Sequence, residues 1–133
     1  AATQQNSGFY SVEDYLEILQ YADARQIEVL PSLDMPGHSR AAIVSMNARY
    51  QRLMLEEKPQ DAKQYFLSEL EDTSEYRSIQ HYNDNTLNPC LDSTYTFIGE
   101  VLNQLKAMHI AAGVPLKHYH IGARVLLGFK IYR

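Results

Sequence analysis

The strongest constraint on the fold is an apolar run at residues 27–33 that leads directly into the segment DMPGH at residues 34–38. The run is too continuous to alternate with solvent, which favours a strand of a parallel sheet covered on both faces. Parallel α/β barrels keep their chemistry at the C-terminal ends of their strands. Asp34 and His38 are therefore the first candidates for a functional site.

Helical patterns flank this predicted strand. Ser11 precedes an amphipathic stretch that ends near residues 25–26, and a hydroxyl at this position is a typical helix cap. Further helices are predicted over residues 39–57, with Ser39 as a possible cap, over a short stretch within 65–70, and from Asp92 or Ser93 to Ala112. Gly113 and Pro115 end the last helix, and a second strand is predicted over 116–121.

The order helix, strand, helix, long loop, helix, strand is typical of parallel α/β architecture. A closed (β/α)8 TIM barrel takes about 250 residues, whereas this chain has 133. The sequence therefore predicts an α/β chain that forms a partial barrel, not a closed one. Its edges and helices need the remainder of the barrel for cover.

Composition excludes several functional classes. A net charge of −4 with scattered Lys and Arg predicts neither nucleic-acid binding nor attraction to anionic membranes. No apolar run approaches the roughly 20 residues of a membrane helix, and the first residues lack a signal-peptide pattern. Cys90 is the single cysteine, so no internal disulfide is possible and a small buried side chain is expected.

Each candidate residue has a plainer interpretation. Asp34 is placed to act at the mouth of a sheet, or it caps the next helix. His38 acts with Asp34, or it is a packed or capping histidine. His118 and His120 are two residues apart, which would put both rings on one strand face as in some metallohydrolases. Asp34 or His38 could supply further metal ligands only if the two strands are neighbours.

Other side chains give weaker signals. Tyr76 and Tyr82 could stack on sugar rings, although most tyrosines at helical spacing belong to the core. Gly122 and Gly128 do not form a phosphate-binding loop, because the flanking pattern of a nucleotide motif is absent. No metal and no cofactor is predicted.

Four blocks resemble the bacterial chitobiases, β-N-acetylhexosaminidases of glycoside hydrolase family 20. They are GFYSVEDY at 8–15, EVLPSLDMPGHSRA at 28–41, NPCLDSTYTF at 88–97 and HYHIG at 118–122. The resemblance runs in order from about residue 8 to residue 123. It implies that residues 1–133 are a fragment of one glycoside hydrolase catalytic domain, covering roughly strands two to four of its barrel.

The resemblance also implies a reaction. Members of this family remove terminal N-acetylglucosamine from chitin oligosaccharides, and the 2-acetamido oxygen of the sugar attacks the anomeric carbon. An Asp orients the acetamido group and a neighbouring Glu protonates the leaving oxygen. By resemblance Asp34 binds hydroxyls of the terminal sugar, and His38 and His120 belong to the surrounding shell. The same resemblance predicts a periplasmic or extracellular protein.

The sequence departs from the family where the catalytic pair is expected. Arg124 and Val125 occupy the positions of the Asp and the Glu, and the tail at 124–133 is unlike the family. Ser32 replaces a usual Glu, and the chain has no Trp, although tryptophans form the family's sugar pocket. We therefore expect no catalytic residue in this chain and hypothesise that the tail is out-of-frame or misassembled sequence.

Two alternatives to an inactive hydrolase fragment remain at this point. A non-catalytic sugar-binding module would keep Asp34 without turnover. A small metallohydrolase would use His118 and His120. For the hydrolase fragment and for the sugar-binding module, the expected partner is an oligosaccharide that contains N-acetylglucosamine.

Overall fold

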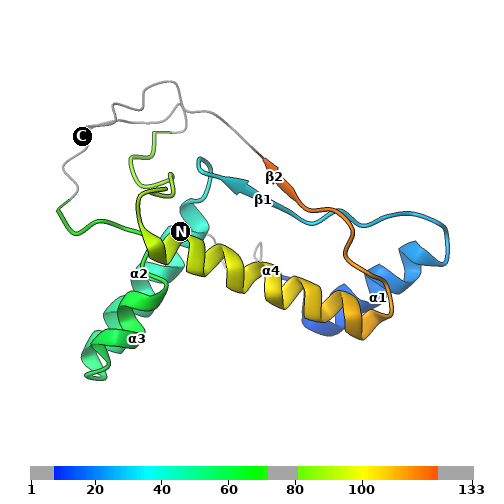
Figure 1. The fold of residues 1–133 in the computed structure, drawn as a ribbon, viewed down its shortest axis with the longest axis horizontal. Helices are drawn as coiled ribbons and strands as arrows, with labels where there is room; N and C mark the ends of the chain where they lie inside the picture. The colour runs from blue at the N-terminus through cyan, green and yellow to red at the C-terminus, as the bar shows by residue number, and fades with distance from the viewer. Residues whose placement is uncertain (1–7, 72–80, 123–133) are drawn as a thin grey trace. The chain divides into compact units, whose positions relative to one another are not determined.

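The computed structural model describes residues 8–71 and 81–122, which divide into two compact units. The first unit takes its described residues from 8–31 and 101–119, and the second from 32–71, 81–100 and 120–122. The helices are α1 (Val12–Asp23), α2 (Arg40–Leu55), α3 (Pro59–Gln64) and α4 (Asp92–Ala112), and the strands are β1 (Ser32–Met35) and β2 (His120–Gly122) (Figure 1). None of the helices in the described part of the chain is long and apolar enough to span a membrane.

In the first unit, α1 begins at a complete capping box. The Asp14 amide donates to Ser11 Oγ at 3.1 Å, and the Ser11 amide donates to Asp14 Oδ2 at 2.8 Å. These two bonds satisfy amides that a helix start leaves without partners. The predicted cap at Ser11 is therefore confirmed.

His109 is the buried polar centre of the first unit. Its side chain is 2% exposed. Its Nδ1 lies 3.0 Å from the carbonyl oxygen of Val114, and its Nε2 lies 3.1 Å from the Tyr15 hydroxyl. A carbonyl only accepts, so Nδ1 carries a proton, and in the neutral form of the ring Nε2 accepts the hydrogen of the Tyr15 hydroxyl. This pair links α1 to the last turns of α4.

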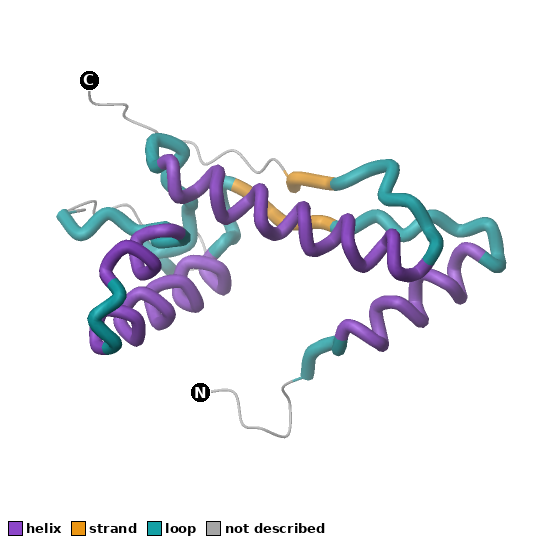
Figure 2. Tube along the Cα trace, turned by 60° about the horizontal axis from the view of Figure 1, so that its bottom comes forward, coloured by secondary structure: helices purple, strands orange, loops and turns teal. Residues whose placement is uncertain are grey.

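The second unit contains a parallel sheet formed by β1 and β2. Ser32 pairs with His120 and Met35 with Gly122, with an irregularity between these two positions. The two strands lie side by side in both views (Figures 1 and 2). The predicted parallel pairing is thus present, in a sheet of two strands among the described residues.

A small apolar cluster forms the core of the second unit. Ile43, Leu67 and Leu87 are nearly inaccessible, and four partly buried side chains pack against them: Met35, Ala42, Met46 and Phe97. Because Met35 ends β1, this cluster anchors the end of the strand to α2 and to the loops that contribute Leu67 and Leu87. The ring of Tyr50 stacks on Phe66 at 4.2 Å between centroids.

Several predicted boundaries were wrong. The strand predicted over 27–33 begins only at Ser32 and extends to Met35, and the strand predicted over 116–121 begins at His120. The short helix expected within 65–70 lies earlier, as α3, because Pro59 occupies a first-turn position and starts a new helix. The predicted burial of Cys90 was also wrong, because its side chain is exposed.

The end of α4 was predicted correctly. Gly113 follows the helix with a φ of +73°, the left-handed conformation that glycine adopts after a helix.

Burial raises the pKa of the Tyr15 hydroxyl above its ordinary value of 10.0. The neutral hydroxyl therefore stabilises the fold fully below about pH 10, and this contribution is lost as the pH rises through the raised pKa. We expect the free energy of unfolding to fall more steeply above about pH 10 for the native chain than for Tyr15→Phe. At neutral pH, Tyr15→Phe should cost about 1 kcal/mol, the value of one hydrogen bond.

Urea denaturation followed by helical circular dichroism measures both effects. The matched control is Tyr21→Phe, because Tyr21 lies on the same helix with a side chain that is 61% exposed. Parallel pH profiles for the native chain and Tyr15→Phe would contradict the assignment.

Candidate functional site

The candidate site is built on residues 34–38, here called the Asp34 turn, which begins with the last two residues of β1 and continues beyond the strand. Asp34 is partly buried, and its carboxylate has no hydrogen-bond or ion-pair partner within residues 8–71 and 81–122. Its main-chain oxygen, in contrast, accepts a hydrogen bond from Ser39 Oγ at 2.6 Å. The backbone of Asp34 is therefore fixed while its carboxylate stays available to a ligand.

Ser39 does not act as the predicted helix cap. It occupies the N-cap position of α2, but its side chain makes no capping bond. The hydroxyl, in a residue 3% exposed, instead reaches back to Asp34 and more distantly to the Gly37 carbonyl, 3.5 Å away. The Ser39 side chain therefore stabilises the Asp34 turn by binding the carbonyl at its first residue.

His38 is exposed at the end of this turn and has a φ of +62°. A side chain other than glycine in this left-handed region is uncommon and costs roughly 1–3 kcal/mol unless its surroundings compensate. Gln26, Glu57 and His81 share this conformation, so it does not by itself mark a functional site. The exposure of His38 does exclude the interpretation as a packed core histidine.

A second segment, residues 81–88, is fastened to the Asp34 turn. The Ser39 amide donates to the carbonyl of Asn85 at 2.9 Å, and the Leu87 amide donates to the carbonyl of Pro36 at 2.8 Å. Leu87 itself is 2% exposed in the apolar cluster. Two backbone bonds and one buried side chain thus hold the 81–88 segment beside the turn.

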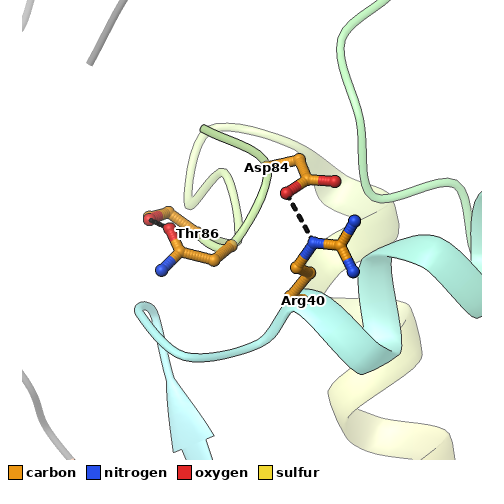
Figure 3. Close-up of polar contacts among 4 residues, drawn as sticks. Arg40, Asp84 and Thr86 are labelled. Carbon is orange, nitrogen blue, oxygen red and sulfur yellow. Dashed lines mark hydrogen bonds and ion pairs between the residues drawn. The ribbon is translucent and has the colours of Figure 1, made fainter. Parts of the chain in front are cut away.

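Arg40 adds a charged contact to the same junction. Its Nε lies 2.8 Å from Asp84 Oδ1, and Figure 3 shows the guanidinium facing this carboxylate, with Thr86 farther along the same segment. The guanidinium carbon also lies 4.5 Å from the centroid of the Tyr82 ring. No local pattern predicts this pairing, because more than forty positions separate Arg40 from its partners.

Gly122 brings β2 close to Asp34. A Cβ atom at position 122 would lie 2.8 Å from both Cα and Cγ of Asp34, closer than packed atoms allow. Gly122 also has a φ of +67°, a conformation that favours glycine. The absence of a side chain at this position is therefore what leaves room for the Asp34 carboxylate.

His120 and Ser32 face each other across the sheet. Ser32 Oγ lies 2.8 Å from His120 Nδ1, and the Gly122 amide donates to the same nitrogen at 3.3 Å. In comparison with the family, Ser32 stands out only as the replacement of a Glu. In the structure its hydroxyl makes a hydrogen bond to the ring of His120. Arg124 and Val125 lie outside the described residues.

The pairing of His118 with His120 in a metal site is not supported. His118 precedes β2, so the two rings do not share a strand face, and its Nδ1 lies 2.6 Å from Glu28 Oε1. No group of three His, Cys, Asp or Glu side chains within the described ranges could hold a metal ion. The prediction that both imidazoles point to one side of a strand was therefore wrong.

Two hollows in the surface lie away from the Asp34 turn. One, of about 530 Å³, is lined in the first unit by apolar side chains that include Val12, Leu105 and Met108. The other, of about 380 Å³, is lined in the second unit by side chains that include Tyr50 and Phe66. Asp34 lines neither hollow, so we place the site by its backbone geometry and its uncommitted carboxylate.

Replacing Arg40 tests the junction between the turn and the 81–88 segment. Arg40→Gln removes an exposed ion pair and a cation–π contact, together worth about 1 kcal/mol. We expect the hydrogen-exchange protection of the Ser39 and Leu87 amides to fall about fivefold, as measured by NMR. Asp84→Asn should reproduce part of this loss. Arg52→Gln is the matched control, since Arg52 lies in the last turn of α2 and pairs with Glu56, the C-cap of that helix, at 3.9 Å. Equal losses in the Arg40 and Arg52 variants would contradict the assignment.

Two glycines should respond to alanine with opposite signs. Gly122→Ala should destabilise the chain by at least about 1–2 kcal/mol, because Ala resists positive φ and its methyl group meets Asp34. Gly99→Ala should stabilise it by about 0.5–1 kcal/mol, because Gly99 lies within α4 with open space around a new Cβ. Urea denaturation measures both, and an unchanged stability for Gly122→Ala would contradict the close approach.

The chain is similar to known enzymes over nearly its whole length. A sequence model described as the catalytic domain of glycosyl hydrolase family 20 matches residues 1–124. Beta-hexosaminidase B of Pseudoalteromonas piscicida is 65% identical over 119 residues, which cover 90% of this chain and 15% of that protein. N,N'-diacetylchitobiase of Vibrio harveyi is 50% identical over 117 residues, or 87% of this chain and 13% of that protein.

A solved structure gives the same answer for the fold. The family 20 exo-β-N-acetylglucosaminidase of Vibrio harveyi, in complex with N-acetylglucosamine, superposes with a TM-score of 0.68 at 39% identity over 90% of this chain and 15% of that one. The chain therefore spans about 15% of the relatives that it matches. The match to the family model and the identity to its members lead to one conclusion: this chain belongs to glycosyl hydrolase family 20.

Proposed function

We propose that this chain is a piece of the catalytic domain of a β-N-acetylhexosaminidase that hydrolyses terminal N-acetylglucosamine from chitin oligosaccharides. The observation that carries the proposal is the family match over residues 1–124, which includes the Asp34 turn and β2. The uncommitted carboxylate of Asp34 supports it, because sugar hydroxyls are recognised by such acceptors. The Vibrio harveyi relative that was solved with N-acetylglucosamine supports the choice of sugar.

In the proposed reaction the acetamido oxygen of the sugar attacks its own anomeric carbon, with retention after water completes the hydrolysis. Asp34 holds hydroxyls of the terminal sugar, and His38 and His120 shape the surrounding shell. The orienting Asp and the protonating Glu are replaced by Arg124 and Val125. A guanidinium cannot accept the amide hydrogen and an isopropyl group cannot donate a proton, so we propose that this chain is inactive alone.

We further propose that the chain corresponds to roughly strands two to four of a (β/α)8 barrel and needs the remaining strands. Large apolar side chains on its surface support this view: Phe9, Leu55, Leu70 and Ile110 are 93%, 87%, 75% and 66% exposed. The hydroxyl of Tyr119 is buried without a hydrogen-bond partner among the described residues. Both features are expected where further chain completes the packing. By the same resemblance the parent protein works in the periplasm or outside the cell.

A chromogenic N-acetylglucosaminide assay tests the proposal. We expect no turnover by the 133-residue chain. In a longer chain that supplies the missing strands, Arg124→Asp combined with Val125→Glu should raise turnover at least about 10²-fold, the usual contribution of a positioned general acid.

The matched control is the same longer chain with Arg124 and Val125 retained. Turnover by that control, or by the short chain alone, would refute the assigned loss of catalysis. A longer chain that folds but stays inactive with the Asp and the Glu restored would refute the hydrolase function itself.

A further inference from the structure

The protonation of His120 follows from the atoms that face its Nδ1. The Gly122 amide points at this nitrogen from 3.3 Å, and a backbone N–H can only donate. Nδ1 must therefore present its lone pair. In the neutral ring the proton then sits on Nε2.

Ser32 completes this arrangement from the neighbouring strand. A serine hydroxyl either donates or accepts, but the only lone pair available at 2.8 Å is that of Nδ1, so Ser32 Oγ donates to it. Two donors thus converge on one ring nitrogen. The bond from Ser32 is also the shorter of the two, so it fixes the orientation of the ring.

The other edge of the ring remains available. His120 is exposed, and its Nε2 has no hydrogen-bond partner in the described part of the chain. β2 carries this ring on the same short strand as Gly122, which approaches Asp34. The ring therefore offers one N–H donor from a strand that borders an uncommitted carboxylate, which is an acceptor.

We propose that His120 acts as a neutral donor through Nε2–H to an oxygen of an N-acetylglucosamine unit, and that Ser32 is the positioning residue that aims it. This inference rests on the proposed function and adds a donor to it. A sugar hydroxyl is both donor and acceptor, so a carboxylate and an N–H on neighbouring strands can bind the same sugar. Ser32 stands where the family usually has a Glu, so the side chain that faces Nδ1 is a hydroxyl, which can donate, and not a carboxylate, which only accepts.

The first measurement needs no sugar. Long-range ¹H–¹⁵N NMR of the 133-residue chain, at a mildly alkaline pH where imidazoles are neutral, distinguishes a protonated ring nitrogen from an unprotonated one. We expect the Nε2–H form for His120. We expect the opposite Nδ1–H form for His109, whose Nδ1 faces a carbonyl, and for His118, whose Nδ1 faces the Glu28 carboxylate. An Nδ1–H form for His120 would overturn the proposal.

Substitutions of Ser32 then separate aiming from folding. Ser32→Thr keeps the hydroxyl and should keep the Nε2–H pattern. Ser32→Asp places an acceptor at Nδ1 and should move the proton to that nitrogen, so that Nε2 no longer donates. A merely structural serine would lower stability in both variants without exchanging the protonated nitrogen, and that result would also overturn the proposal.

Titration with N-acetylglucosamine tests the ligand. We expect the Nε2–H signal of His120 to shift together with the amides of Asp34 and His38, and the shift at His120 to be lost in Ser32→Asp but kept in Ser32→Thr. A response at Asp34 and His38 without one at His120 would overturn this inference and leave the proposed function intact. No response at His120, Asp34 or His38 would refute sugar binding by this chain, and with it the proposed sugar contact of His120. Which ring nitrogen of His120 carries the proton would still be decided by the NMR measurement without sugar.

Discussion

The close approach of two parallel strands governs the candidate site. At Gly122 the second strand comes so near to Asp34 that a methyl group has no room, and the positive φ of Gly122 makes that approach possible. The same residue donates its amide to His120. One glycine therefore leaves the space for the carboxylate and gives the imidazole a second donor beside Ser32. The remaining contacts of the site consolidate what this approach establishes.

Main-chain and side-chain groups have different roles around the Asp34 turn. The Asp34 and Pro36 carbonyls of the turn accept hydrogen bonds from Ser39 Oγ and the Leu87 amide, and the adjoining Ser39 amide donates to the Asn85 carbonyl. The backbone is therefore fixed from two directions. The Asp34 carboxylate and the outer nitrogen of His120 have no partner within the described residues. Binding sites benefit from this separation, because a group that is already held in place loses little freedom when a ligand arrives. The geometry thus resembles a preorganised site even in a short piece of its domain.

Local patterns in the sequence predicted the helices well and the strands poorly. Ser11, Gly113 and the apolar spacing of the last helix act over a few residues, so they can be read from the chain directly. A strand exists only through its partner, and β1 has a partner only where β2 reaches it. This explains why residues 27–31, although apolar, lie outside the sheet. Helix α3 begins earlier than predicted because Pro59 lies in its first turn, where the fixed φ and missing N–H of proline are tolerated.

The candidate site was predicted in part. Asp34 and His38 stand out because a polar turn follows an apolar run. The roles of Arg40, Asp84 and Gly122 depend on contacts between distant parts of the chain, and no spacing rule predicts such contacts. The suggested pairing of His118 with His120 failed for a different reason: it assumed that both lie on one strand, whereas β2 begins only at His120. The family resemblance indicated Asp34, His38 and His120 as site residues. The hydrogen bonds that hold the Asp34 turn and the His120 ring were found only in the structure.

The two-stranded sheet has a consequence for handling the isolated chain. In the described residues each strand has one neighbour, so each also presents an outer row of amides and carbonyls that is open to a further strand. Such rows can pair with those of a second copy as readily as with the rest of the same domain. Self-association of the isolated chain should therefore increase with its concentration, and adding the flanking strands should suppress it.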